Sequence, residues 1–169
     1  MNRAARYLTL LLTVAMAGCQ ASTTRPGFLP LPEASITDLR LEVPQATRLL
    51  AEGLAADSFL IRRVEERDGY LESEWIRFPG WEQEDAQVYN SSVTKVRAWV
   101  DPTHQFWSRV SVEVVYRIAV DPSRDPRDFE RAISPTHTLH QRVAAVLRVL
   151  ALKYGDLVEE KPGATPRTP

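Results

Sequence analysis

The sequence predicts an α+β domain: a four-stranded antiparallel sheet, made of two hairpins, with two helices packed on one face. Residues 106–120 alternate between apolar and polar side chains, which indicates a strand with one face buried. Asp68-Gly69 separates two strand-like runs, a strong short signal for a hairpin. Apolar residues recur at helical spacing in residues 44–57 and 135–154. The predicted element order is α-β-β-β-β-α, within a domain spanning residues 44–155.

Both predicted helices carry end signals. Pro44 and Pro135 stand where a first helical residue would, Ser134 is placed to cap the second helix, and Gly155 is placed to end it. Gly53 either weakens the first helix or marks a close approach to the sheet. The second helix presents an apolar stripe made of Leu139, Val143, Val146, Leu147, Leu150 and Tyr154.

The first hairpin joins residues 59–67 to residues 70–78. A two-residue turn between these strands pairs Arg62 with Trp75. An acidic loop, residues 81–90, follows the hairpin.

The second hairpin joins residues 92–100 to residues 106–120. With residues 101–105 as the loop, two tryptophans and two arginines face each other on the side away from the helices. These pairs are Trp99 with Trp107 and Arg97 with Arg109.

The outward face of the sheet is the candidate binding surface, because no predicted element remains to cover it. Trp and Arg are enriched in binding hot spots, and each arginine can stack on a nearby tryptophan. Two facing arginines repel, so an anion held between them is a narrower hypothesis. The alternative is that the tether, a loop or the tail covers this face, or that the pairs only stabilise the sheet. The predicted contact residues are Arg97, Trp99, Trp107, Arg109, Arg62 and Trp75.

Residues 1–18 have the layout of a secretory signal. Arg3 and Arg6 form a basic head, an uncharged apolar run follows, and small residues precede Cys19, the only cysteine. The apolar run is shorter than the ~20 residues that span a bilayer. The alternative is a buried N-terminal helix with an incidental thiol.

The stretch Met16-Ala17-Gly18-Cys19 resembles the lipobox of bacterial lipoproteins. The resemblance implies cleavage before Cys19, acylation of Cys19 and, because Gln20 rather than Asp follows, the outer membrane. Residues 19–43 are then the acylated cysteine and a proline-rich tether with a possible edge strand, and residues 156–169 form a disordered tail. The tether could reach roughly 80 Å from Cys19 to Pro44.

Composition narrows the partners. The chain is 44% hydrophobic and 25% charged, as in globular proteins. Arg3 and Arg6 supply two of the 21 basic residues, so the chain from Cys19 onward carries 19 basic against 22 acidic residues. This balance argues against nucleic acid as a partner. With Cys19 acylated, no thiol remains for a disulfide or a cysteine-based zinc site.

The sequence shows no catalytic constellation. His137 and His140 have a spacing that could chelate a metal, but no carboxylate or thiol completes the site. His104 lies alone in a predicted loop, and no nucleophile elbow or phosphate-binding glycine loop occurs. We therefore expect neither enzyme activity nor a cofactor. An envelope hydrolase would need His104 beside a carboxylate and a nucleophile.

The run from Gly69 through Ser73 to Trp75 is similar to a Gly-x-hydrophobic-x-Ser/Thr-x-Trp strand of BamC-like envelope lipoproteins. With Cys19, the tether and the order of elements, the chain resembles the helix-grip domains of the BamC lipoprotein and the LptE lipoprotein. The resemblance implies a non-catalytic accessory subunit, held at the membrane, that binds another envelope protein during outer-membrane assembly or maintenance. The alternative is a periplasmic carrier of a lipid or small apolar ligand, with a cavity under Val110, Val112, Val114 and Leu147.

Overall fold

The computed structural model describes residues 24–77, 93–117 and 122–155. Four predicted features lie outside these residues: the signal with Cys19, the acidic loop, the end of the long strand beyond Arg117, and the tail. What the sequence predicts for them therefore stays a prediction. The strands are β1 (Ser35–Leu39), β2 (Ile61–Glu65), β3 (Tyr70–Ser73), β4 (Val93–His104), β5 (Trp107–Arg117) and β6 (Glu130–Ala132). The helices are α2 (Val43–Ala56) and α4 (Thr138–Tyr154), with a short 3-10 helix, η1 (Pro126–Phe129).

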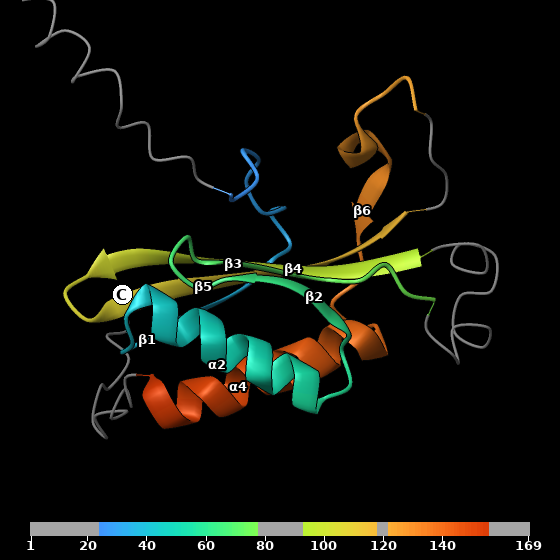
Figure 1. Cartoon of the computed structure of the whole chain (residues 1–169). Helices are drawn as coiled ribbons and strands as arrows, with labels where there is room; N and C mark the ends of the chain where they lie inside the picture. The colour runs from blue at the N-terminus through green and yellow to red at the C-terminus, as the bar shows by residue number, and fades with distance from the viewer. Residues whose placement is uncertain (1–23, 78–92, 118–121, 156–169) are drawn as a thin grey trace, which may run out of the picture.

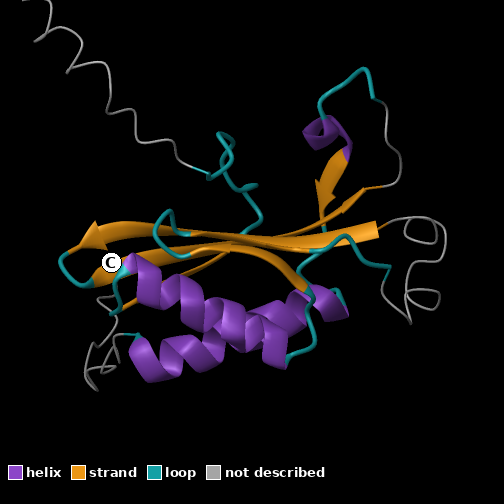
Figure 2. Ribbon diagram, viewed as in Figure 1, coloured by secondary structure: helices purple, strands orange, loops and turns teal. Residues whose placement is uncertain are grey.

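An open antiparallel sheet carries both helices on one face (Figures 1 and 2). The strand order is β1-β5-β4-β3-β2, and β6 pairs with β5 further along the edge that β1 occupies. The predicted α+β class and the two helices on one face are confirmed. The predicted four-stranded sheet and the predicted order α-β-β-β-β-α are wrong, because β1 precedes α2, β6 precedes α4, and the two strands extend the sheet to six. The sequence indicated β1 only as a possible edge strand, and three-residue β6 is too short to show alternation.

The core lies between the sheet and the helices. Val96, Ala98 and Val100 on β4 and Val110, Val112 and Val114 on β5 are buried there, as their alternation predicts. The helices contribute Leu50, Leu54, Leu139, Val143 and Leu147. These apolar contacts supply the main stabilisation of the fold.

The helix ends agree with the sequence for α2 and differ for α4. Pro44 lies in the first turn of α2, and Gly155 follows the last residue of α4. Helix α4 begins at Thr138 rather than at Pro135, because the buried ring of His137 caps it: Nδ1 accepts a hydrogen bond from Leu139 N–H at 3.1 Å. A histidine in the cap position is uncommon, and the Ser-Pro pair gave a stronger signal.

Gly53 marks a close approach, but to α4 and not to the sheet. A Cβ at this position would lie 2.9 Å from Cγ1 of Val146. Gly53 therefore lets the two helices come together at a distance that a larger residue would prevent.

Both predicted hairpin registers are wrong. In the first hairpin Glu65 pairs with Tyr70, so four residues form the loop and Arg62 does not face Trp75. Gly69 has φ of 63°, and a Cβ there would lie 2.1 Å from the carbonyl oxygen of Val100. The close contact with β4, together with the left-handed backbone, fixes glycine at this position.

In the second hairpin, β4 continues to His104 and only Gln105 and Phe106 connect it to β5. The facing pairs are Trp99 with Ser111, Arg97 with Glu113 and Asp101 with Arg109. The observed register replaces two facing arginines by two pairs of opposite charge, which favours it over the predicted one. Residues 101–105, predicted as the loop, include Pro102, which instead lies in β4 where the pairing is irregular, a place that tolerates proline.

Candidate functional site

An N-terminal segment, residues 24–33, lies over part of the outward face of the sheet, opposite the helices (Figure 1). Ion pairs and hydrogen bonds hold this segment along its length. At one end Thr24 binds the carboxylate of Asp68, and Arg25 pairs with Asp101 at 2.7 Å. At the other end Leu31 N–H donates to Glu113 at 2.9 Å. The predicted free tether is therefore a layer of the domain from Thr24 onward.

Two of the predicted contact residues are consequently buried. Trp99 is 0% exposed and packs edge-on against Phe28 and Tyr70, with ring centroids 5.9 and 5.6 Å apart. Arg97 is 6% exposed. The expectation that this face is open is wrong for both residues, because the N-terminal segment brings Phe28 over them. A partner can contact Trp99 only if that segment moves.

Arg97 belongs to a buried arginine–glutamate cluster, made of Arg97, Glu113, Arg127 and Glu130. Arg97 pairs with Glu113 at 3.0 Å and with Glu130 at 2.5 Å. Arg127, from η1, pairs with Glu113 at 2.6 Å and with Glu130 at 3.1 Å. Each charge thus has two partners of opposite sign, which offsets the cost of removing it from water.

In the cluster, the pKa values of Glu130, Arg97 and Arg127 shift in the directions that favour their charged forms. Burial alone would raise the pKa of Glu130, but hydrogen bonds and charge from Arg97 and Arg127 outweigh it and lower that pKa below its ordinary value. The pKa of Arg97 is raised for the reciprocal reason, although burial opposes the rise. The hypothesis that Arg97 and Arg109 hold an anion between them is therefore wrong for Arg97, since its guanidinium is already paired with two carboxylates.

The other predicted contact residues do not form one surface. Arg109 is exposed and pairs with Asp38 at 2.8 Å instead of stacking on a tryptophan. Trp107 stacks on His104 at the tip of the β4–β5 hairpin, with ring centroids 5.1 Å apart. Half-buried Trp75 lies under Arg117 and Lys95, at 4.2 and 5.0 Å, while Arg62 points to solvent. Partner binding by these residues stays a prediction.

The histidines are dispersed. His137 caps α4, His140 lies 3.3 Å from the hydroxyl of Ser35, and His104 is at the far hairpin tip. Burial lowers the pKa of His140. Within the described ranges, no group of three metal-ligating side chains forms.

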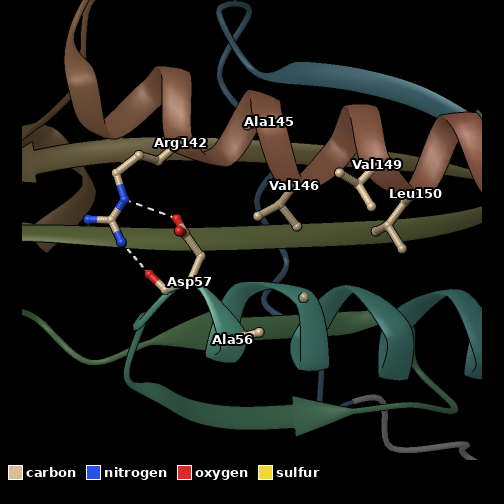
Figure 3. Close-up of a pocket in the computed structure, with 8 residues that line it drawn as sticks. Ala56, Asp57, Arg142, Ala145, Val146, Val149 and Leu150 are labelled. Atoms are coloured by element: carbon tan, nitrogen blue, oxygen red, sulfur yellow. Dashed lines mark hydrogen bonds and ion pairs between the residues drawn. The ribbon is translucent and has the colours of Figure 1, made fainter.

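A groove between the two helices forms a pocket (Figure 3). Its volume is about 440 Å³, and apolar side chains line most of it. At one end Arg142 on α4 binds Asp57 after α2, with Nε 3.0 Å from Oδ2, and Arg142 also donates to the Asp57 carbonyl oxygen. We call this pocket the helix groove; it is lined by Gly53, Ala56, Asp57, Arg142, Ala145, Val146, Val149 and Leu150.

The helix groove opens to solvent, as the 64% exposure of Val149 on its rim shows. It lies between the helices rather than between helices and sheet. The side chains expected to line a ligand cavity, those of Val110, Val112, Val114 and Leu147, pack in the core. The sequence signals for the groove were small residues at facing positions, Gly53 and Ala56 on α2 and Ala145 on α4. However, the spacing of residues within one helix cannot show which of them face residues of another helix.

Comparison with known proteins assigns the chain to no family. Neither a protein-family model nor a curated protein sequence matches it. Among the residues that the structure describes, no helix has the length and apolarity needed to cross a membrane.

Proposed function

We propose that this chain is a lipid-anchored, non-catalytic binding protein of the bacterial cell envelope, serving as an accessory subunit in outer-membrane assembly or maintenance. Cys19, acylated and at the new N-terminus, is the anchor. The helix groove is the contact surface for an apolar segment of an envelope protein. The observation that carries the proposal is the groove itself, an apolar, solvent-open pocket on the helical layer. On the opposite face of the sheet, Phe28 covers Trp99 and Arg97.

The chemistry of the groove suits insertion of apolar side chains. Three small residues leave room in the groove: Gly53, Ala56 and Ala145. Apolar contact comes from Val146, Val149 and Leu150. The Asp57–Arg142 pair closes one end and offers hydrogen bonds that can fix the orientation of a bound segment. Removing such apolar surface from water favours binding by about 25 cal/mol per Å².

The same groove favours a second function, in which the occupant is a lipid or another small apolar ligand. Its volume of about 440 Å³ lies within the range of small-molecule sites, ~300–1,000 Å³. This alternative retains the anchor and changes only the occupant of the groove.

The anchor is tested on the full chain expressed in a Gram-negative host. We expect mass spectrometry of the N-terminal peptide to find cleavage before Cys19 and three acyl chains. Cys19→Ser should abolish cleavage and acylation. An unmodified Cys19 in the mature protein would exclude the anchor.

The groove is tested by affinity purification from detergent-solubilised membranes, comparing the wild type with Val149→Asp. Leu152→Asp is the matched control, since Leu152 lies on the same helix, is 68% exposed and does not line the groove. We expect Val149→Asp to lose a defined envelope protein that the wild type and Leu152→Asp retain. Recovery of a lipid instead, lost only in Val149→Asp, would establish the alternative. Equal recovery with both variants would refute the groove as the site.

A further inference from the structure

The tip of the β4–β5 hairpin projects beyond the rest of the sheet. Strand β3 accompanies β4 only as far as Val100, which donates to Gly69, and β1 accompanies β5 only from Ser108 onward. Asp101 and Pro102 face Arg109 and Ser108, which still pair with β1 on their other side. Beyond them only the His104–Trp107 pair and the turn remain, so the tip extends about 10 Å past Pro102 as a two-stranded ribbon, at ~3.3 Å per residue.

The end of this ribbon carries two aromatic side chains. Phe106 is 58% exposed, and Trp107 stacks on His104. Phe106 also has φ of 63°, a backbone region that bulky residues seldom adopt and that Gly, Asn or Asp would occupy more easily. A phenylalanine in this position indicates a use for its side chain beyond completing the turn.

The segment after β1 flanks the aromatic tip on one side. Its residues Arg40, Leu41, Glu42 and Gln45 line a pocket of about 410 Å³ together with Phe106. An aromatic end flanked by hydrogen-bonding groups is typical of the water–lipid interface, where the ring enters the apolar boundary and polar neighbours bind headgroups.

The start of the described chain lies at the same end of the sheet. Thr24 binds Asp68 in the β2–β3 turn, and Arg25 pairs with Asp101 at the base of the ribbon. Only four residues lie between Cys19 and Thr24, and the five residue steps from one to the other span at most about 18 Å at full extension. An acyl group on Cys19 therefore keeps the bilayer surface close to the hairpin end of the domain.

We propose that the β4–β5 tip, with Phe106 and Trp107 at its end, docks on the lipid surface in which Cys19 is anchored. The inference rests on the anchor of the proposed function. Docking gives the domain a fixed orientation: the β4–β5 tip faces the bilayer, and the opposite end of the sheet, near Thr94, faces away from it.

The charges around the β4–β5 tip indicate which lipid headgroups the docking requires. Arg109 pairs with Asp38 and faces Asp101, Arg25 pairs with Asp101, and Arg40 lines the pocket beside Phe106 with Glu42, so neither sign dominates. Aromatic insertion rather than attraction to anionic headgroups then carries the contact, and zwitterionic lipid is enough.

The test uses the full mature chain, with its own acyl groups, in vesicles of phosphatidylcholine brominated on the acyl chains. Bromine quenches only indoles that reach the lipid. We expect the tryptophan emission of the wild type to be quenched and most of that quenching to be lost in Trp107→Phe. Phe106→Asn, which fits the left-handed backbone, should also lose it. Trp75→Phe is the control: Trp75 lies beside Lys95, toward the opposite end of β4, and this variant should keep the quenching.

Equal quenching in the wild type and Trp107→Phe, or none in either, would overturn docking of the tip. An unmodified Cys19 would overturn the anchor instead. In that case Cys19 of each protein is coupled to maleimide-bearing phosphatidylethanolamine and the quenching is measured again. Loss confined to Trp107→Phe and Phe106→Asn would then support the tip as a lipid-contacting surface without the biological anchor.

Discussion

At the scale of single residues, the buried arginine–glutamate cluster links the elements on the outward side of the sheet to one another. Its four side chains come from β4, β5, η1 and β6, so each ion pair also fixes the position of an element. Breaking a buried pair on one side leaves a charge without compensation, which costs about 3–5 kcal/mol. The cluster therefore explains why short β6 keeps its place at the sheet edge.

Glu130→Gln should lower the free energy of unfolding by about 3 kcal/mol at pH 7, because Arg97 and Arg127 lose a charged partner. The pKa of Glu130 is lowered in the folded protein from an ordinary value of 4.5. Its contribution is therefore complete above pH 4.5 and is lost as the pH falls through the lower, folded value. The difference between wild type and variant should shrink in that acid range, as denaturant titrations at several pH values would measure.

Glu65→Gln is the matched control for this prediction. Glu65 pairs with Arg63 at 3.0 Å, but both side chains are about one third exposed, so the pair contributes little. A loss of stability in Glu65→Gln as large as in Glu130→Gln would contradict the role of burial in the cluster.

At the scale of elements, the contact between α2 and α4 depends on Gly53. Alanine favours a helix over glycine by about 1 kcal/mol, but a Cβ at Gly53 would press on Val146. We expect Gly53→Ala to raise the melting temperature little or to lower it, and to narrow the helix groove.

Val146→Ala combined with Gly53→Ala removes the clash and should recover the gain in helix propensity relative to Val146→Ala alone. Calorimetric melting of the four proteins in this cycle measures the coupling. Additive effects of the two substitutions would contradict direct contact between these positions.

The elements also show what the sequence could reveal. The helices and inward strand faces follow from periodicity, so Val110, Val112 and Leu147 were placed correctly in the core. Registers depend on turns, and both turns misled: Asp68-Gly69 belongs to a four-residue loop, and Pro102 lies within β4. A shift in register changes every facing pair, which is why Arg97 meets Glu113 and not Arg109.

The candidate site was less predictable than the fold. The residues of the helix groove belong to two helices far apart in sequence, and their meeting depends on tertiary packing. The covering of Trp99 depends on Phe28, in a proline-containing stretch with no periodicity. Such a stretch reads as a tether because its contacts are made by hydrogen bonds and single side chains rather than by a repeating apolar face.

At the scale of the whole molecule, the domain has three layers: helices, sheet and N-terminal segment (Figure 2). Phe28 holds the third layer in place, since the guanidinium groups of Arg127 and Arg97 lie 4.4 and 5.2 Å from its ring centroid and its ring makes a T-shaped contact with Trp99. Such aromatic and cation–π contacts contribute about 0.5–1.5 kcal/mol each.

Phe28→Ala should lower the free energy of unfolding by about 1–2 kcal/mol and make tryptophan emission more accessible to acrylamide. The reason is that Trp99 loses the ring that shields it from solvent. The adjacent and more exposed Leu29 offers the control Leu29→Ala, which should change neither measurement. Unchanged quenching in Phe28→Ala would mean that other residues shield Trp99.

The third layer also sets the order in which the chain can fold. Arg25, Leu31 and Leu29 are synthesised early, yet their partners Asp101, Glu113 and Arg127 follow 76, 82 and 98 residues later. The outward face cannot close until η1 and β6 have been made, and contacts so distant in sequence form slowly. A chain exported as we propose would thus stay incompletely folded during translocation, and its domain would close only on the far side of the inner membrane.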